Sequence, residues 1–305
     1  MKLSRRGAAA LSVMALSLTA ACGSGTEGAN GVTVGLAVST LNNPYFVQLA
    51  DGAREAAAEL GVKLIVVDAQ NDAINQTNQV QTFTSQDVKS IIINPVDSTQ
   101  ARPAAKAAEN ANIPLISVDR SIDGGKVASE ITSDNVQGGR LAAIALGQVT
   151  SGAVVHLQGL PGTSASRDRG QGFEQGLSSA TIEVVATQPA DFDRTKGLDV
   201  MTNLLQSHPT LTGVFAENDE MALGAIRALG DRAGTDVQVV GFDGTPDALA
   251  AIEAGAMAAT IAQQPRVLGR TAVDQAVQAA KGEQVQQVID VEVKVVTRQN
   301  VAAFK

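Results

Sequence analysis

Short, unbroken apolar runs alternate with helix-like stretches along almost the whole chain. The first five runs are VTVGLAV, VKLIVVDA, SIIINP, PLISVD and VASEITSD, at 32–38, 62–69, 90–95, 114–119 and 127–134. Their β-branched residues follow one another without polar alternation, as in parallel strands that are buried on both faces. Between them lie segments such as 47–61, in which Ala and Leu recur at helical spacing before Gly61. This pattern predicts a doubly wound parallel sheet.

The same pattern then starts again. The second series of runs is AVVHLQG, IEVVATQ, LTGVFAEN, VQVVGFD and MAATIAQQ, at 153–159, 182–188, 211–218, 237–243 and 257–264. Ten strands are many for one open sheet, so we predict two similar α/β lobes. The segment 289–297 alternates between apolar and polar residues over most of its length, which indicates an edge strand or a strand that crosses between the lobes.

The amino terminus has the order of a secretory signal. Lys2, Arg5 and Arg6 precede the apolar stretch 7–21, which is shorter than the roughly 18 to 20 residues of a membrane-spanning helix. Residues 1–21 are therefore expected to be removed. Cys22 is the only cysteine, so it forms no intrachain disulfide, and its position after LTAA resembles a bacterial lipobox. We expect Cys22 to be lipidated and to anchor the chain to the membrane, with 22–31 as a flexible tether.

Charge argues against nucleic acid as a partner. Removal of residues 1–21 takes three basic and no acidic residues from 23 Lys+Arg and 31 Asp+Glu, which leaves a net charge of −11. Such a surface repels phosphate backbones. The remaining length is enough for two medium-sized domains.

Polar side chains follow the predicted strands at the points where they end. In open α/β sheets, ligands bind outside the carboxyl ends of the strands. Asn and Asp are also common there as helix caps and turn formers, but Arg and Gln are not. Half of the eight aromatic residues fall in the same places, namely Tyr45, Phe46, Phe192 and Phe242. Aromatic faces combined with bidentate polar groups suit a sugar, which offers C–H faces and a ring of hydroxyls.

At these strand ends the sequence resembles a known family over about residues 32–297. The motifs that carry the resemblance are STLNNPYF, INPVDS, SVDRS, SDNVQGG, LQGLPGTSASRDRGQGF, QPADFDRTKGLDVM, FAENDEMALGAIRAL, VVGFDGTPDALAAI and AATIAQQP. In order and spacing they are similar to the pentose- and hexose-binding proteins of bacterial ABC importers, and within that family to its ribose binders. The family is related to the sensor domains of lactose-repressor-type proteins.

The resemblance implies the type I periplasmic-binding-protein fold, with three hinge strands that join two lobes. By sequence position, the N-terminal lobe would comprise 32–133 with 264–292, and the C-terminal lobe 134–263 with 293–305. The lobes would close on one monosaccharide, D-ribose, and deliver it to a permease, with no cofactor and as a monomer. The residues implied as hydrogen-bonding partners of the sugar are Asn43, Asn94, Asp119, Arg120, Arg169, Asn218, Asp243 and Gln263. Tyr45, Phe46 and Phe192 would sandwich its ring, although many ribose binders carry Phe where this chain has Tyr45.

Other classes of function fit the sequence less well. An enzyme is disfavoured because His156 lies inside a predicted strand and His208 precedes a proline, so neither is placed as an acid or base. The segment 191–197 echoes the start of a calcium loop, but Asn203 stands where a bidentate Glu is required, so no metal site is predicted. A repressor would need a DNA-binding domain, for which the first 31 residues are too short. Two alternatives stay open: another sugar, such as allose, a hexose or a furanosyl signal, and a sensor or chemoreceptor as partner.

Overall fold

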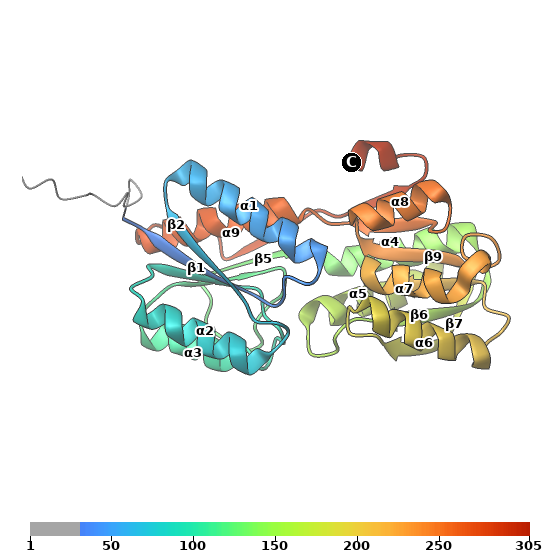
Figure 1. Ribbon diagram of the computed structural model, residues 1–305, viewed down its shortest axis with the longest axis horizontal. Coiled ribbons are helices and arrows are strands. Elements are labelled where there is room, and N and C mark those ends of the chain that lie inside the picture. The colour runs from blue at the N-terminus through green and yellow to red at the C-terminus, as the bar shows by residue number, and fades with distance from the viewer. Residues whose placement is uncertain (1–30) are drawn as a thin grey trace, which may run out of the picture.

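The computed structural model describes residues 31–305, which form two α/β lobes (Figure 1). The predicted signal segment and Cys22 lie outside the described residues. Each of the ten predicted runs corresponds to one strand, β1 to β10, so the predicted fold class is confirmed. Within the described part of the chain, no helix is long and apolar enough to span a membrane.

The first lobe is built on a sheet in which every neighbouring pair of strands is parallel. In sheet order its strands are β11 (Val288–Val291), β5 (Ser129–Ser133), β4 (Leu115–Val118), β3 (Ser90–Ile93), β1 (Thr33–Val38) and β2 (Lys63–Asp68). Helices α1 (Pro44–Leu60) and α9 (Pro265–Ala280) cover one face, and α2 (Ala73–Ser85) and α3 (Arg102–Asn110) cover the other (Figure 1). Strands β1, β3 and β4 are buried almost throughout on both faces, which explains their apolar sequences.

The second lobe repeats this arrangement with one reversed strand. In sheet order its strands are β12 (Lys294–Thr297), β10 (Ala259–Ala262), β9 (Gln238–Asp243), β8 (Gly213–Ala216), β6 (Gly152–Gln158) and β7 (Ile182–Pro189). One face carries α4 (Asn135–Val149) and α5 (Ser164–Gly176), and the other carries α6 (Arg194–Ser207), α7 (Asp219–Leu229) and α8 (Pro246–Ala254). Short 3-10 turns lie at Leu177–Ser179, Gly230–Arg232 and Val301–Phe304. Strand β12 is antiparallel to β10, so this sheet is mixed at its edge.

The chain passes between the two sheets at three places. These are the connections from β5 to α4, from β10 to α9 and from β11 to β12. The alternating tail therefore supplies one edge strand to each sheet, as its pattern indicated. All three crossings follow the carboxyl end of a strand, so they lie at the same side of both sheets as the polar residues singled out in the sequence.

Close helix packing fixes α5 against α4. A Cβ at Gly139 of α4 would overlap the carbonyl oxygen of Arg169 in α5, and a Cβ at Gly172 of α5 would overlap the carbonyl oxygen of Val136 in α4. Only glycine permits so near an approach of two backbones. The two glycines thereby set the position of the helix turn that carries Arg169.

Candidate functional site

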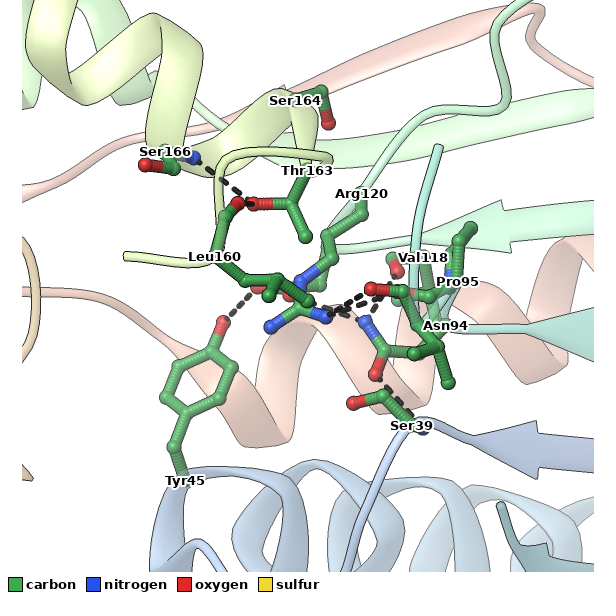
Figure 2. Close-up of polar contacts among 12 residues, drawn as sticks. Ser39, Tyr45, Asn94, Pro95, Val118, Arg120, Leu160, Thr163, Ser164 and Ser166 are labelled. Atoms are coloured by element: carbon green, nitrogen blue, oxygen red, sulfur yellow. Dashed lines mark hydrogen bonds and ion pairs between the residues drawn. The ribbon is translucent and has the colours of Figure 1, made fainter. Parts of the chain in front are cut away.

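Nine of the eleven predicted site residues line one cavity between the two lobes. They are Asn43, Tyr45, Phe46, Asp119, Arg120, Arg169, Phe192, Asn218 and Asp243, joined by Ala165, which the sequence analysis did not single out. Tyr45, Asn94 and Arg120 converge from α1 and from the ends of β3 and β4 (Figure 2). The polar residues after the strands of both lobes thus meet at one place, as the strand-end rule predicts.

Asn94 and Gln263 lie behind the lining. The Asn94 amide donates to Asp119 Oδ2 at 3.1 Å and to the Val118 carbonyl at 3.2 Å, while its Oδ1 accepts from Ser39 N at 3.1 Å. Gln263 contacts Arg169 and Tyr45. Both side chains hold residues of the lining in place. Their own direct contact with a ligand stays a prediction.

Local structure explains why several lining residues sit at helix starts. Asn43 precedes α1 and its Oδ1 accepts from Tyr45 N at 2.9 Å, and Asn218 precedes α7 and accepts from Met221 N at 2.9 Å. These bonds satisfy otherwise unpaired N–H groups at the helix ends. The cap role and the pocket role therefore coincide in the same two amides. The Asn218 amide nitrogen also donates to the Phe192 carbonyl at 3.3 Å, which leaves one of its two N–H groups as a donor.

Aromatic rings and guanidinium groups alternate across the cavity. The Arg120 guanidinium lies 5.2 Å from the centre of the Phe46 ring and 5.3 Å from that of Phe192. Arg169 lies 3.8 Å above the ring of Phe242, which is fully buried beneath it. Cations over aromatic faces are attracted to the ring quadrupole. Phe242 therefore supports Arg169 and does not line the cavity, whereas Phe46 and Phe192 do.

Each arginine is buried beside an aspartate. Arg120 Nε is 3.7 Å from Asp119 Oδ2, and Arg169 Nη1 is 3.5 Å from Asp243 Oδ1. Burial raises the pKa of Asp243 well above its usual range, although Arg169 opposes that shift. Burial likewise lowers the pKa of Arg120, while Asp119 opposes the shift. Pairing offsets part of the cost of removing these charges from water.

Arg169 is held by the protein on almost every side. It donates to Asn135 Oδ1 at 2.9 Å, to the Glu217 carbonyl at 2.5 Å and to Gln263 Oε1 at 2.8 Å. Since a guanidinium has five N–H groups, most of them are already used. Arg120 differs, because its Nε is buried without a hydrogen-bond partner among the described residues. Arg120 therefore retains a donor that a ligand would satisfy.

The backbone is strained at three lining residues. Asp119, Phe192 and Asp243 have φ angles of 68°, 61° and 121°, in the region that side chains other than glycine rarely adopt. At Asp119 a bond from its N–H to the Ile131 carbonyl, 2.7 Å long, holds this conformation. Such strain tends to gather at binding sites, where it aims side chains inward.

Contacts between the lobes also occur beside the cavity. Ser98 N donates to the Gly162 carbonyl at 2.9 Å, Ser164 N donates to Ser98 Oγ at 3.0 Å, and Ser121 N donates to Ser164 Oγ at 2.9 Å. The cavity itself has a volume of only about 10 Å³, enough for about one water molecule. It adjoins a cleft of about 320 Å³, whose lining shares Asn43, Phe46, Arg120 and Phe192 with it. A sugar ring therefore requires the lobes to separate or side chains to move before it can enter.

The residues outside the cavity account for the remaining sequence observations. His156 is buried and its Nε2 lies 2.9 Å from Glu217 Oε1, away from the cavity lining. Arg167, two residues before Arg169, pairs at 3.0 Å with Asp123 on the protein surface. Among the described residues, no group of three or more His, Cys, Asp or Glu side chains is arranged to hold a metal ion.

A pocket built by both lobes, at the carboxyl ends of two doubly wound sheets, defines the class of bilobal solute-binding proteins. A family model described as "Periplasmic binding protein domain" matches residues 34–284, so the chain belongs to that family. It is 49% identical to the ribose import binding protein RbsB of Escherichia coli K12, over 90% of this chain and 95% of the relative.

Two further comparisons show the range of related ligands. The chain is 33% identical to the D-allose-binding periplasmic protein of Escherichia coli K12, over 80% of this chain and 83% of the relative. It superposes with a TM-score of 0.84 and 35% identity on an ABC transporter solute-binding protein of Bacillus halodurans with bound myo-inositol, covering 90% of this chain and 96% of that one. These two relatives are thus named for, or hold, D-allose and myo-inositol.

The only tyrosine of the chain gives a pH prediction. Burial, and next the negative charge of Asp119, raise the pKa of Tyr45 well above its ordinary value of 10.0. Because the unfolded phenol then loses its proton first, stability is present below pH 10 and is lost as pH rises above it. The phenolate absorbance should therefore appear together with the loss of far-ultraviolet circular dichroism. Ionisation of the phenol near pH 10 while the protein is still folded would contradict this prediction. Tyr45→Phe is the control, because it lacks the only tyrosine and gives no phenolate absorbance.

Proposed function

We propose that this protein is an extracytoplasmic solute-binding lipoprotein that captures D-ribose and delivers it to an ABC transporter permease. The observation that carries the proposal is the meeting of Phe46 and Phe192 with Asp119 and Arg120 in a cavity that both lobes build. The 49% identity to a ribose import binding protein over nearly the full length supports ribose as the ligand.

The cavity offers what a pentose needs. Phe46 and Phe192 present faces for the C–H groups of the ring, and Asp119 and Asp243 accept hydrogen bonds from hydroxyls. The free Nε–H of Arg120 and the amide nitrogens of Asn43 and Asn218 donate. Ribose has about ten heavy atoms, so a dissociation constant near ~1 μM requires about −0.8 kcal/mol per atom, which lies within the ceiling for small ligands. That efficiency is reached only when nearly every hydroxyl is paired.

Binding would close the two lobes. We propose that 32–133 with 264–292 and 134–263 with 293–305 move as units about the three crossings between the sheets. Hinge closure of this kind is a general property of periplasmic binding proteins. The closed lobes would present their rims to the permease, and the protein would act as a monomer without a cofactor or catalytic activity.

Another sugar is the second candidate, because the chain also matches a D-allose-binding protein at 33% identity. Allose differs from ribose in size by one hydroxymethyl group, which the pocket must exclude or admit. The lower identity favours ribose. A sensor or chemoreceptor in place of the permease would use the same pocket.

Isothermal titration calorimetry against ribose, allose, galactose, xylose and arabinose tests the ligand. We expect ribose to bind at least tenfold more tightly than the other four. If a hexose binds more tightly than ribose, that hexose is the ligand and ribose is not. If none of the five sugars binds, the proposal that the cavity is a sugar site is wrong.

The same titration on variants tests the site. Arg120→Met should weaken ribose binding by at least tenfold, because unpaired buried hydroxyls cost about 1 to 3 kcal/mol each. The matched control is Arg140→Met, since Arg140 lies on α4 and bonds to Gln175 at the surface. Equal affinities of the two variants would show that Arg120 does not contact the sugar.

The lipid anchor rests on the sequence around Cys22. Two acyl chains anchor a protein stably, so the wild type should sediment with membranes and Cys22→Ser should be released into the medium. Fractionation followed by immunoblotting measures this. If the variant remains membrane-bound to the same extent as the wild type, Cys22 is not the anchor.

A further inference from the structure

The Tyr45 hydroxyl forms two hydrogen bonds in the interior, of which the one to Asp119 is short. It donates to Asp119 Oδ1 at 2.6 Å and accepts from Gln263 Nε2 at 2.9 Å. The side chain is buried, with 3% of its surface exposed. A stacking wall alone would need only the ring, so the hydroxyl requires its own explanation.

These bonds belong to an unbroken chain from one lobe to the other. Arg169, on α5 of the second lobe, donates to Gln263 Oε1, and Gln263 Nε2 donates to Tyr45 at the first turn of α1. Tyr45 then donates to Asp119, which follows β4 of the first lobe. Gln263 itself follows β10, at one of the three crossings.

The direction of every bond is fixed by chemistry. A guanidinium only donates, so the oxygen of the Gln263 amide must face Arg169 and its nitrogen must face Tyr45. A carboxylate only accepts, so the phenol must donate to Asp119. Burial and the charge of Asp119 raise the pKa of Tyr45, so the hydroxyl remains a donor at neutral pH. Bonds aligned in this way, between two charged ends, polarise and strengthen one another.

We propose that the Tyr45 hydroxyl is a positioning group, which couples the Asp119 carboxylate of the first lobe to the Arg169 guanidinium of the second. This inference rests on the proposed function, in which Asp119 accepts a hydrogen bond from the sugar and Arg169 lines the same cavity. The coupling orients Asp119 from one oxygen while Asn94 holds the other at 3.1 Å. The same hydrogen bonds also stabilise the arrangement in which the two lobes are in contact. A phenylalanine at this position would keep the wall and lose the coupling.

Tyr45→Phe tests the proposal, because the ring and its packing are retained. Ribose binding measured by calorimetry should weaken by about tenfold, the cost of one hydrogen bond to a charged group. The matched control is Ser90→Ala, which deletes a buried hydroxyl that bonds to the Pro114 carbonyl at the start of β3, away from the cavity. The control should bind as the wild type does. Unchanged affinity in Tyr45→Phe would overturn the proposal.

A double-mutant cycle separates coupling from direct contact. Gln263→Met retains the length of the side chain and removes both ends of its amide. In that background Tyr45→Phe should cost less than threefold in affinity, because the chain is already broken. If the fold-losses in affinity of the two single variants multiply to give that of the double variant, the hydroxyl acts on the sugar independently of Gln263. That result would contradict coupling.

The outcomes distinguish this inference from the proposed function. If the wild type binds no ribose, the proposed function fails. The same four proteins are then compared by their midpoints of urea unfolding. Effects of the two substitutions on stability that are not additive support the hydrogen-bond chain, and additive effects refute it. If the wild type binds ribose and Tyr45→Phe binds it equally well, only the positioning role of the hydroxyl fails.

Discussion

Two buried arginine–aspartate pairs, one in each lobe and both lining the cavity, are the constraint on which the rest of the structure depends. Arg120 with Asp119 and Arg169 with Asp243 are each almost fully removed from water. Burial of charge is costly unless pairing and hydrogen bonds offset it. The surrounding structure supplies those bonds from strand ends, from the Glu217 carbonyl and from the amides of Asn94, Asn135 and Gln263. A ligand with several hydroxyls would complete the same network.

The scaffold sets this network by bringing the carboxyl ends of two sheets to one place. Parallel strands end in loops on a common edge, so each βα unit contributes a polar residue there. The glycine contacts between α4 and α5 bring Arg169 to that edge, and positive φ angles aim Asp119 and Asp243 inward. Outside the cavity, Ser98 and Ser164 join the lobes directly. The contacts that hold the two lobes together are therefore shared between the cavity and the protein contacts beside it.

Much of the fold was predictable from the sequence, because the ten predicted runs correspond to the strands β1 to β10 and therefore locate the strand ends. Strand ends in turn pointed to Asn43, Asp119, Arg120, Asn218 and Asp243, which the sheet topology brings together, whereas Arg169 in α5 came from the family resemblance. The sequence could not show that Asn94 and Gln263 lie behind the lining, or that Ala165 belongs to it, since these depend on side-chain direction after the lobes meet. It also could not assign partners to the Tyr45 hydroxyl, which come from residues far apart in the chain. The reversal of β12 follows from the last crossing, which no local pattern encodes.

The central claim is that the two lobes form one site that closes over a single sugar. Small-angle X-ray scattering of the mature protein with and without saturating ribose tests it most directly. We expect a smaller radius of gyration with ribose, and a smaller change for Arg120→Met at a sugar concentration just sufficient to saturate the wild type. A profile that stays unchanged at a ribose concentration shown by calorimetry to saturate the wild type would contradict it.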